Sequence, residues 1–237
     1  MAYIIINGVS SKLIDGLLIQ SLPPITKPKQ RTRIEEIDGR DGDIITALGF
    51  SAYDKPVLIG LYGDYNVDDV IKYFSTSGKV TFSNELDKYY NFAVYDAIDF
   101  NKLIRFKTAT VNLHVQPFKY SVEERPILVN NTASATILEI PVRNTGNIYS
   151  RPTLTVTGAG VITVYINNVQ VFSINAGTGK TVILDAVSMN ATDASGNFYN
   201  RQVIGDLNNL VFPTGNNILR VTGNVTSVKL ETYSRWQ

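Results

Sequence analysis

The sequence predicts a mainly β protein with two domains: a β-rich first domain with one helix, and a second domain that is a β-sandwich. Three observations lead to this prediction. Apolar residues make up 44% and charged residues 18% of the 237 residues, which is the composition of a globular chain. Short stretches rich in β-branched and aromatic residues alternate with turn residues along most of the chain. Residues 66–78 alone give a convincing apolar pattern at helical spacing.

The boundary between the domains is predicted where an alternating strand pattern meets proline. Residues 111–116 place Val and Leu on one face and polar side chains on the other. Pro117 cannot donate to a sheet ladder, so the pattern stops there or moves to an edge, and Pro126 repeats the interruption. We therefore predict a first domain at residues 1–125 and a second at residues 126–237.

The first element with a distinctive charge pattern is a predicted hairpin with a long polar tip. Glycines at both ends of Gly39-Arg40-Asp41-Gly42 favour a turn, and apolar residues resume at Ile44. In an extended strand, alternate side chains share a face, so four basic residues before the turn form one stripe. The candidate interface residues in this hairpin are Lys27, Lys29, Arg31, Arg33, Arg40 and Asp41.

Two interpretations of the basic stripe remain open. It could bind a carboxylate or phosphate on a partner, or it could be a solvated face neutralised by the nearby Glu35 and Glu36. The aspartates of the tip have the wrong spacing for a calcium loop, which also needs a later Glu. We predict no metal site there.

The one predicted helix begins after Asn66, a residue type that caps helix N-termini through its side chain. Two aspartates follow at the positive end of the helix dipole. Val67, Val70, Ile71 and Phe74 recur at helical spacing and predict a face that packs on a sheet. Gly78 is predicted to end the helix as a C-cap.

Aromatic residues are clustered in the strands that follow the helix. Strands are predicted at residues 79–83 and 89–98, with a closing strand at residues 106–116. Tyr89 and Tyr90 are the members of this cluster that we select as candidate interface residues, because tyrosines are enriched in protein interfaces. Ordinary cross-strand packing is the alternative.

The second domain shows short strands separated by turns every eight to twelve residues, as in a β-sandwich. Its clearest turn is Asn167-Asn168, because asparagine tolerates the positive φ that a two-residue hairpin needs. Sandwiches often bind sugars on exposed aromatic rings, so Trp236 and Tyr199, with Phe198, are candidate sugar-stacking residues. Packing is the alternative for each of them.

Catalytic motifs are missing from the sequence. There is no cysteine, and the single histidine, His114, lies on the polar face of a predicted strand with no nucleophile motif. No phosphate-binding or dinucleotide-binding glycine pattern precedes a helix. Glycoside hydrolysis needs only a pair of carboxylates and no further motif, so this class of enzyme stays open. We predict no enzyme activity, no cofactor and no metal.

Charge and terminal sequence constrain partners and location. Twenty-two basic and 21 acidic residues give a net charge of +1, which does not favour nucleic acid or an anionic membrane as the main partner. The N-terminus lacks the basic and apolar regions of a signal peptide, and no apolar run is long enough to span a bilayer. Without cysteines, synthesis in a reducing cytoplasm is expected.

The order of several motifs resembles a known family. In the first half these are IDGRDGD at residues 37–43, NVDDVIKYFSTSG at residues 66–78 and VQPFKYS at residues 115–121. In the second half they are NTGNIYS at residues 144–150, FPTGNN at residues 212–217 and a closing Arg235-Trp236. Together they resemble the distal tail proteins (Dit) of long-tailed, non-contractile bacteriophages and prophages of Gram-positive bacteria.

The resemblance implies a structural protein of the virion. In such proteins an N-terminal domain closes into a homohexameric ring around a channel, and a galectin-like C-terminal sandwich projects from it. The implied partners are other copies of the chain, in single or stacked rings, together with the tail tube, tape measure, tail-associated lysin-type hub and receptor-binding proteins. DNA would pass through the channel without specific binding, and no membrane is involved.

Three classes of function therefore compete. The first is a baseplate adaptor of the phage tail tip, in which the basic stripe would contact acidic groups of a neighbouring subunit or of the tail tube. The second is a carbohydrate-binding module for adhesion to the host cell wall. The third is a hydrolase.

Overall fold

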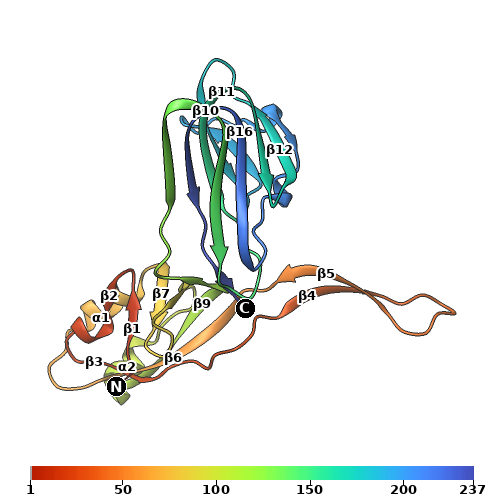
Figure 1. Cartoon of the computed structure of the whole chain (residues 1–237). Helices are drawn as coiled ribbons and strands as arrows, with labels where there is room; N and C mark the ends of the chain where they lie inside the picture. Colours follow the sequence, from red (N-terminus) through yellow and green to blue (C-terminus); the bar gives the residue numbers. More distant parts are fainter. Residues whose placement is uncertain (1) are drawn as a thin grey trace. The chain divides into compact units, whose positions relative to one another are not determined.

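The computed structural model describes residues 2–237, apart from the side chains of residues 131–136. It confirms the mainly β fold (Figure 1). The chain divides into two compact units, Met1–Val122 with Gln237, and Glu123–Trp236. In the part of the chain that the structure describes, no helix is long and apolar enough to cross a membrane.

Within its described residues, the first unit contains two α-helices and a strongly curled sheet. The elements, in chain order, are β1 (Ile4–Ile6), β2 (Val9–Ser10), the 3₁₀ turn η1 (Ser11–Leu13), β3 (Leu17–Ser21), β4 (Gln30–Glu35), β5 (Ile44–Phe50), β6 (Tyr53–Leu61), α1 (Val67–Phe74), β7 (Gly78–Phe82), β8 (Lys88–Ala93), α2 (Phe100–Phe106) and β9 (Thr108–Ser121). The main sheet runs β2-β1-β7-β8-β9-β6-β3, whereas β4 and β5 form a separate two-stranded sheet. The predicted hairpin is thus confirmed.

The helices of the first unit differ from the prediction in two ways. Asn66 caps α1 as predicted, since its Oδ1 accepts a hydrogen bond from the Asp68 backbone N–H at 3.0 Å. Gly78 is not the C-cap, because α1 ends at Phe74 and Gly78 begins β7 with φ 138°, where a Cβ atom would collide with the Asn7 side chain.

The prediction of one helix is wrong, because α2 is a second one. Asp99 caps it by accepting from the Lys102 backbone N–H at 2.9 Å, and Leu103 is its single buried residue. Seven residues with two phenylalanines and one buried position give too little helical periodicity to detect, and packing against β9 stabilises the helix instead.

The predicted closing strand is longer than expected. It begins at Thr108 rather than at residue 106, and it continues through Pro117 to Ser121. Its pairing with β6 ends at Val115, so Pro117 removes no hydrogen bond from that ladder, and Lys119 and Tyr120 still pair with β8.

The second unit is a β-sandwich, as predicted. Its elements are β10 (Ile127–Asn144), β11 (Thr153–Ile166), β12 (Val169–Asn175), β13 (Lys180–Asp185), β14 (Asn190–Asp193), the 3₁₀ turns η2 (Asn200–Gln202) and η3 (Leu207–Asn209), β15 (Val203–Gly205), β16 (Gly215–Glu231) and β17 (Arg235–Trp236). Figure 1 shows that β10, β11 and β16 are long and run side by side.

These three long strands belong to both layers of the sandwich. The first part of β11 pairs with β13, which continues to β14, and its last part pairs with β12, which continues to β15. Strand β16 follows β11 through both parts. One apolar core joins the two layers. Leu154 and Val228 belong to the layer with β13 and β14, and Val164 and Leu219 belong to the layer with β12 and β15.

Glycine allows the long strands to bend between the layers. The register of β11 with β16 shifts between Ala159 and Thr163, and Gly223 stands opposite this bend with φ 121°. A Cβ atom on Gly223 would lie 2.5 Å from the Val161 carbonyl oxygen, so a larger residue does not fit.

The Asn167-Asn168 hairpin is also confirmed, with φ 51° and 68°.

Candidate functional site

The hairpin of β4 and β5 exposes more apolar surface than an ordinary surface loop. Ile34 and Ile45 form a cross-strand pair and are 57% and 65% exposed, and Leu48 is 54% exposed. An isolated two-stranded hairpin is marginally stable in water, and exposed apolar patches mark interaction sites. This hairpin is therefore the main candidate for a protein contact in the first unit.

The predicted basic stripe lies on this hairpin and is exposed. Arg31 and Arg33 share one face of β4, while Lys27 and Lys29 lie just before the strand. Arg33 forms an ion pair with Glu35 at 2.7 Å, so part of the stripe is neutralised within the chain, as the alternative interpretation proposed. Arg40 and Asp41 lie exposed in the tip. Whether these residues contact a partner stays a prediction.

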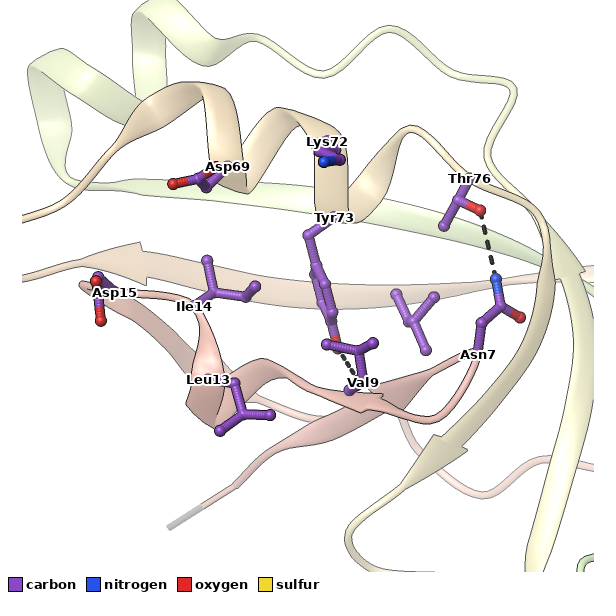
Figure 2. A pocket seen from close by; sticks show the side chains of 10 residues that line it. Asn7, Val9, Leu13, Ile14, Asp15, Asp69, Lys72, Tyr73 and Thr76 are labelled. Carbon is purple, nitrogen blue, oxygen red and sulfur yellow. Dashed lines mark hydrogen bonds between the residues drawn. The ribbon is translucent and has the colours of Figure 1, made fainter.

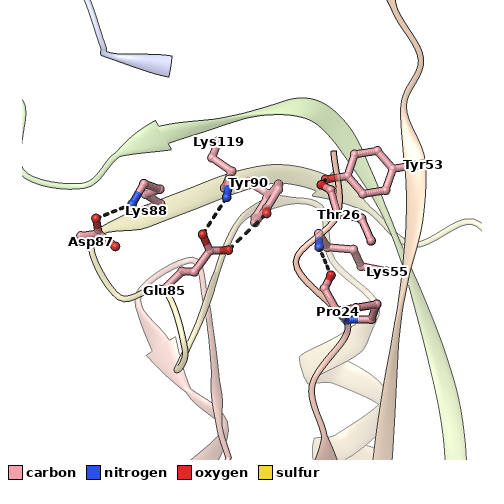
Figure 3. Close-up of polar contacts among 9 residues, drawn as sticks. All are labelled: Pro24, Thr26, Tyr53, Lys55, Glu85, Asp87, Lys88, Tyr90 and Lys119. Atoms are coloured by element: carbon pink, nitrogen blue, oxygen red, sulfur yellow. Dashed lines mark hydrogen bonds and ion pairs between the residues drawn. The ribbon is translucent and has the colours of Figure 1, made fainter. Parts of the chain in front are cut away.

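Buried charges lie at the root of the hairpin. Lys55, two residues into β6, is 2% exposed and its Nζ donates to the Pro24 carbonyl oxygen at 2.9 Å. Lys119 of β9 is 6% exposed and pairs with Glu85 at 2.7 Å. Tyr90 donates its hydroxyl to the other oxygen of Glu85 at 3.4 Å (Figure 3). Lys119 and Tyr90 thus share one carboxylate, whose charge also acts on the buried Lys55.

The titration of Lys55 makes the stability of the first unit depend on pH in the alkaline range. Burial lowers the pKa of Lys55 to about 8, the Glu85 carboxylate opposes this shift, and Lys119 adds to it. Between this value and the ordinary pKa of about 10.5, the unfolded chain holds a proton that the folded chain has released. Stability of the first unit should therefore rise with pH above about 8.

We expect Lys55→Met to remove this pH dependence. Urea unfolding at pH 7.0 and pH 9.5 measures it: the unaltered chain should gain stability at the higher pH relative to the variant. Lys102→Met is a matched control, because Lys102 is exposed on α2. Equal pH slopes for the unaltered chain and Lys55→Met would show that Lys55 keeps its proton throughout.

The two tyrosines selected as candidate interface residues are packed within the first unit. Tyr90 is 1% exposed, and Tyr89 stacks on Tyr120 with ring centroids 5.5 Å apart. Lys79 Nζ lies 4.4 Å from the centroid of the Tyr89 ring. These contacts give both side chains a structural role, and a role in an interface stays a prediction.

A hollow of about 400 Å³ lies between α1 and the segment of β1, β2 and η1. The Tyr73 ring of α1 points into it, and the Tyr73 hydroxyl shares its single proton between the backbone carbonyls of Ile4 and Val9, each at 3.1 Å. Figure 2 shows Asp15 and Asp69 at one end of the hollow and Asn7 and Thr76 at the other. No sequence motif marks this hollow, because its lining residues come from two separate segments, residues 6–15 and 69–76.

The predicted sugar-stacking residues of the second unit differ in exposure. Tyr199 is half-buried, packs on the core and donates its hydroxyl to the Asn175 carbonyl at 2.9 Å. Trp236 is half-buried in β17. Phe198 is 76% exposed and lines a hollow of about 560 Å³ with Asn200 and Gln202. A sugar site on these residues stays a prediction.

The candidates for chemistry are few. His114 lies 2.7 Å from Asp54 through its Nδ1 atom and beside the Tyr95 ring, at a centroid distance of 5.0 Å. Among the residues that the structure describes, no three side chains of His, Asp and Glu are grouped to hold a metal ion.

Comparisons with known proteins identify the fold. No family model and no curated protein matches the sequence. Among solved structures, the chain has the fold of phage baseplate proteins. The match to a chain of the phage P2 baseplate, in its activated conformation with Ca, covers 99% of this chain and 98% of that chain, at 7% identity and a TM-score of 0.52. More particularly, it has the fold of the Dit protein (gp 19.1) of SPP1, a hub of the adsorption apparatus in phages that infect Gram-positive bacteria. Both chains are covered completely, at 17% identity and a TM-score of 0.63.

Proposed function

We propose that this chain is the distal tail hub of a long-tailed, non-contractile phage or prophage of a Gram-positive host. It forms a homohexameric ring in the virion that joins the tail tube to the adhesion apparatus, and DNA passes through its channel. The observation that supports this proposal most strongly is the shared fold with SPP1 Dit, which extends over the whole of both chains and thus includes both units.

The exposed hairpin supports self-association of the first unit. A closed ring of identical subunits needs a heterologous contact, in which two different surfaces of each copy meet. The hairpin supplies one such surface, because its isoleucines are exposed and its strands pair with each other rather than with the main sheet. Residues 1–125 are accordingly the proposed ring-forming domain.

Residues 126–237 are the proposed docking domain for the receptor-binding proteins. Tail tube, tape measure and tail-associated lysin-type proteins are the other proposed partners. The role is structural rather than catalytic, and the protein is synthesised in the host cytoplasm before it joins the tail.

Negative-stain imaging of the purified protein tests the ring. We expect discs with a central hole and projecting lobes, the lobes being the sandwich units. Small particles without a hole, at all protein concentrations, would contradict the proposal.

Carbohydrate binding by the sandwich is the second candidate, favoured by the exposed ring of Phe198 beside amide side chains in one hollow. Glycan-array binding that Phe198→Ala abolishes, with Phe106→Ala as a control of similar exposure on α2, would support it. Unchanged or absent binding would contradict it.

A further inference from the structure

The hairpin of β4 and β5 has a distinct order of side chains along its length. The basic residues Lys27, Lys29 and Arg31 come first, and the exposed pair Ile34 and Ile45 follows toward the tip. A surface that binds this hairpin should therefore be acidic where the hairpin begins and apolar further along.

The hollow beside α1 has this order. A second hollow of about 400 Å³, lined by Asp15, Tyr62 and Asp64, adjoins the first and shares Asp15 with it. Asp15, Asp64 and Asp69 are exposed and gather at this acidic end, with Lys72 as the single basic lining residue. We call the two hollows together the α1 groove.

The wall of the α1 groove formed by β2 and η1 is apolar. Leu13 is 73% exposed and Val9 is 45% exposed, and both line the first hollow (Figure 2). Apolar side chains of this exposure that border a hollow are typical of an interaction surface.

Within one copy, the hairpin and the α1 groove lie at opposite ends of the same pair of strands. The chain leaves β3 at Ser21 to enter the hairpin and returns at Tyr53 to begin β6. The groove lies at the other end, where Asp15 precedes β3 and Asp64 follows β6, and Leu17 pairs with Leu61. Nine residues of β6 separate the two features, roughly 30 Å of extended strand.

We propose that the α1 groove binds the hairpin of a second copy of this chain, with Lys29 and Arg31 facing Asp15 and Asp64, and Ile34 and Ile45 packing on Leu13 and Val9. This inference rests on the proposed function and specifies its interface. Because donor and acceptor surfaces lie at opposite ends of one copy, the contact runs head to tail, as ring closure requires.

Charge reversal on each side, followed by mixing, tests this pairing. The hairpin variant Lys29→Glu/Arg31→Glu and the groove variant Asp15→Lys/Asp64→Lys change exposed side chains. Like charges placed opposite each other cost several kcal/mol, so each variant alone should bind its own kind at least about 100-fold more weakly and sediment as a monomer.

A one-to-one mixture of the two variants should assemble again. Every contact in an alternating ring then joins either an unaltered pair or a pair in which both charges are reversed, so six subunits can close. Glu123→Lys, an exposed reversal outside both surfaces, should leave the ring intact. Circular dichroism melting of each variant checks that it is folded.

The possible results separate this inference from the proposed function. Rings that survive either reversal, or folded variants whose mixture stays monomeric, overturn the inference while the ring itself stands. Leu13→Asp provides a second test that does not depend on charge pairing, and a ring that tolerates it overturns the inference as well. An unaltered chain that is monomeric overturns the proposed function instead.

Discussion

Replacing Glu85 by glutamine should destabilise the first unit by about 3–5 kcal/mol, the usual effect of removing one partner from a buried ion pair. Glu85 is the acceptor for Lys119 and lies near Lys55, and both ammonium groups are almost completely buried. Without the carboxylate, two buried cations repel each other with no compensating charge. Tyr90 also loses a charged acceptor for its hydroxyl.

Urea unfolding followed through amide hydrogen exchange of β8 and β9 measures this effect in the first unit. Asp87→Asn is the matched control, because the Asp87 side chain is 64% exposed and pairs with Lys88 at the surface. An exposed pair contributes about 1 kcal/mol or less. A loss for Glu85→Gln no larger than that of the control would show that the buried lysines do not depend on this carboxylate.

Removing the hairpin should abolish assembly and leave the fold of the first unit intact. Residues 31–48 can be replaced by four Gly and Ser residues, because Gln30 pairs with Phe50 and the cut ends at Gln30 and Gly49 therefore lie close together. Within the described residues, the apolar core of the first unit takes no side chain from this segment. Phe50, which contacts Phe118 with ring centroids 5.3 Å apart, remains in place.

Light scattering and thermal unfolding should therefore give opposite results for this deletion. We expect the mass to fall to that of one chain and the stability of the first unit to change by less than about 1 kcal/mol, as for other surface changes. A deletion variant that still forms rings would place the subunit contact elsewhere. A variant that unfolds would give the hairpin a structural role within its own chain.

Local sequence patterns predict much of this fold. Asn66 marks the start of α1, and Asn167-Asn168 marks a hairpin, because these side chains suit a specific backbone conformation. Patterns fail where tertiary packing decides. Helix α2 has too few buried positions to show a period, and Gly78 serves the approach of Asn7 rather than a helix end.

The groups at the hairpin root and in the α1 groove could not be predicted from sequence patterns. Lys55 of β6, Lys119 of β9 and Glu85, in the turn before β8, are far apart in the sequence. They come together because β6, β9 and β8 are neighbours in the sheet. Asp15 and Asp64 come together because β3 pairs with β6. In both cases the strand order places the charges, and a single sequence does not show that order.

The mass of the purified full-length chain in solution tests the central claim most directly. One chain has a mass of 26.2 kDa. Multi-angle light scattering at low ionic strength should give six times this mass, or twelve times if two rings stack, and the mass should fall as salt screens the basic hairpin from the acidic groove. A mass of 26.2 kDa at every protein concentration would contradict the account.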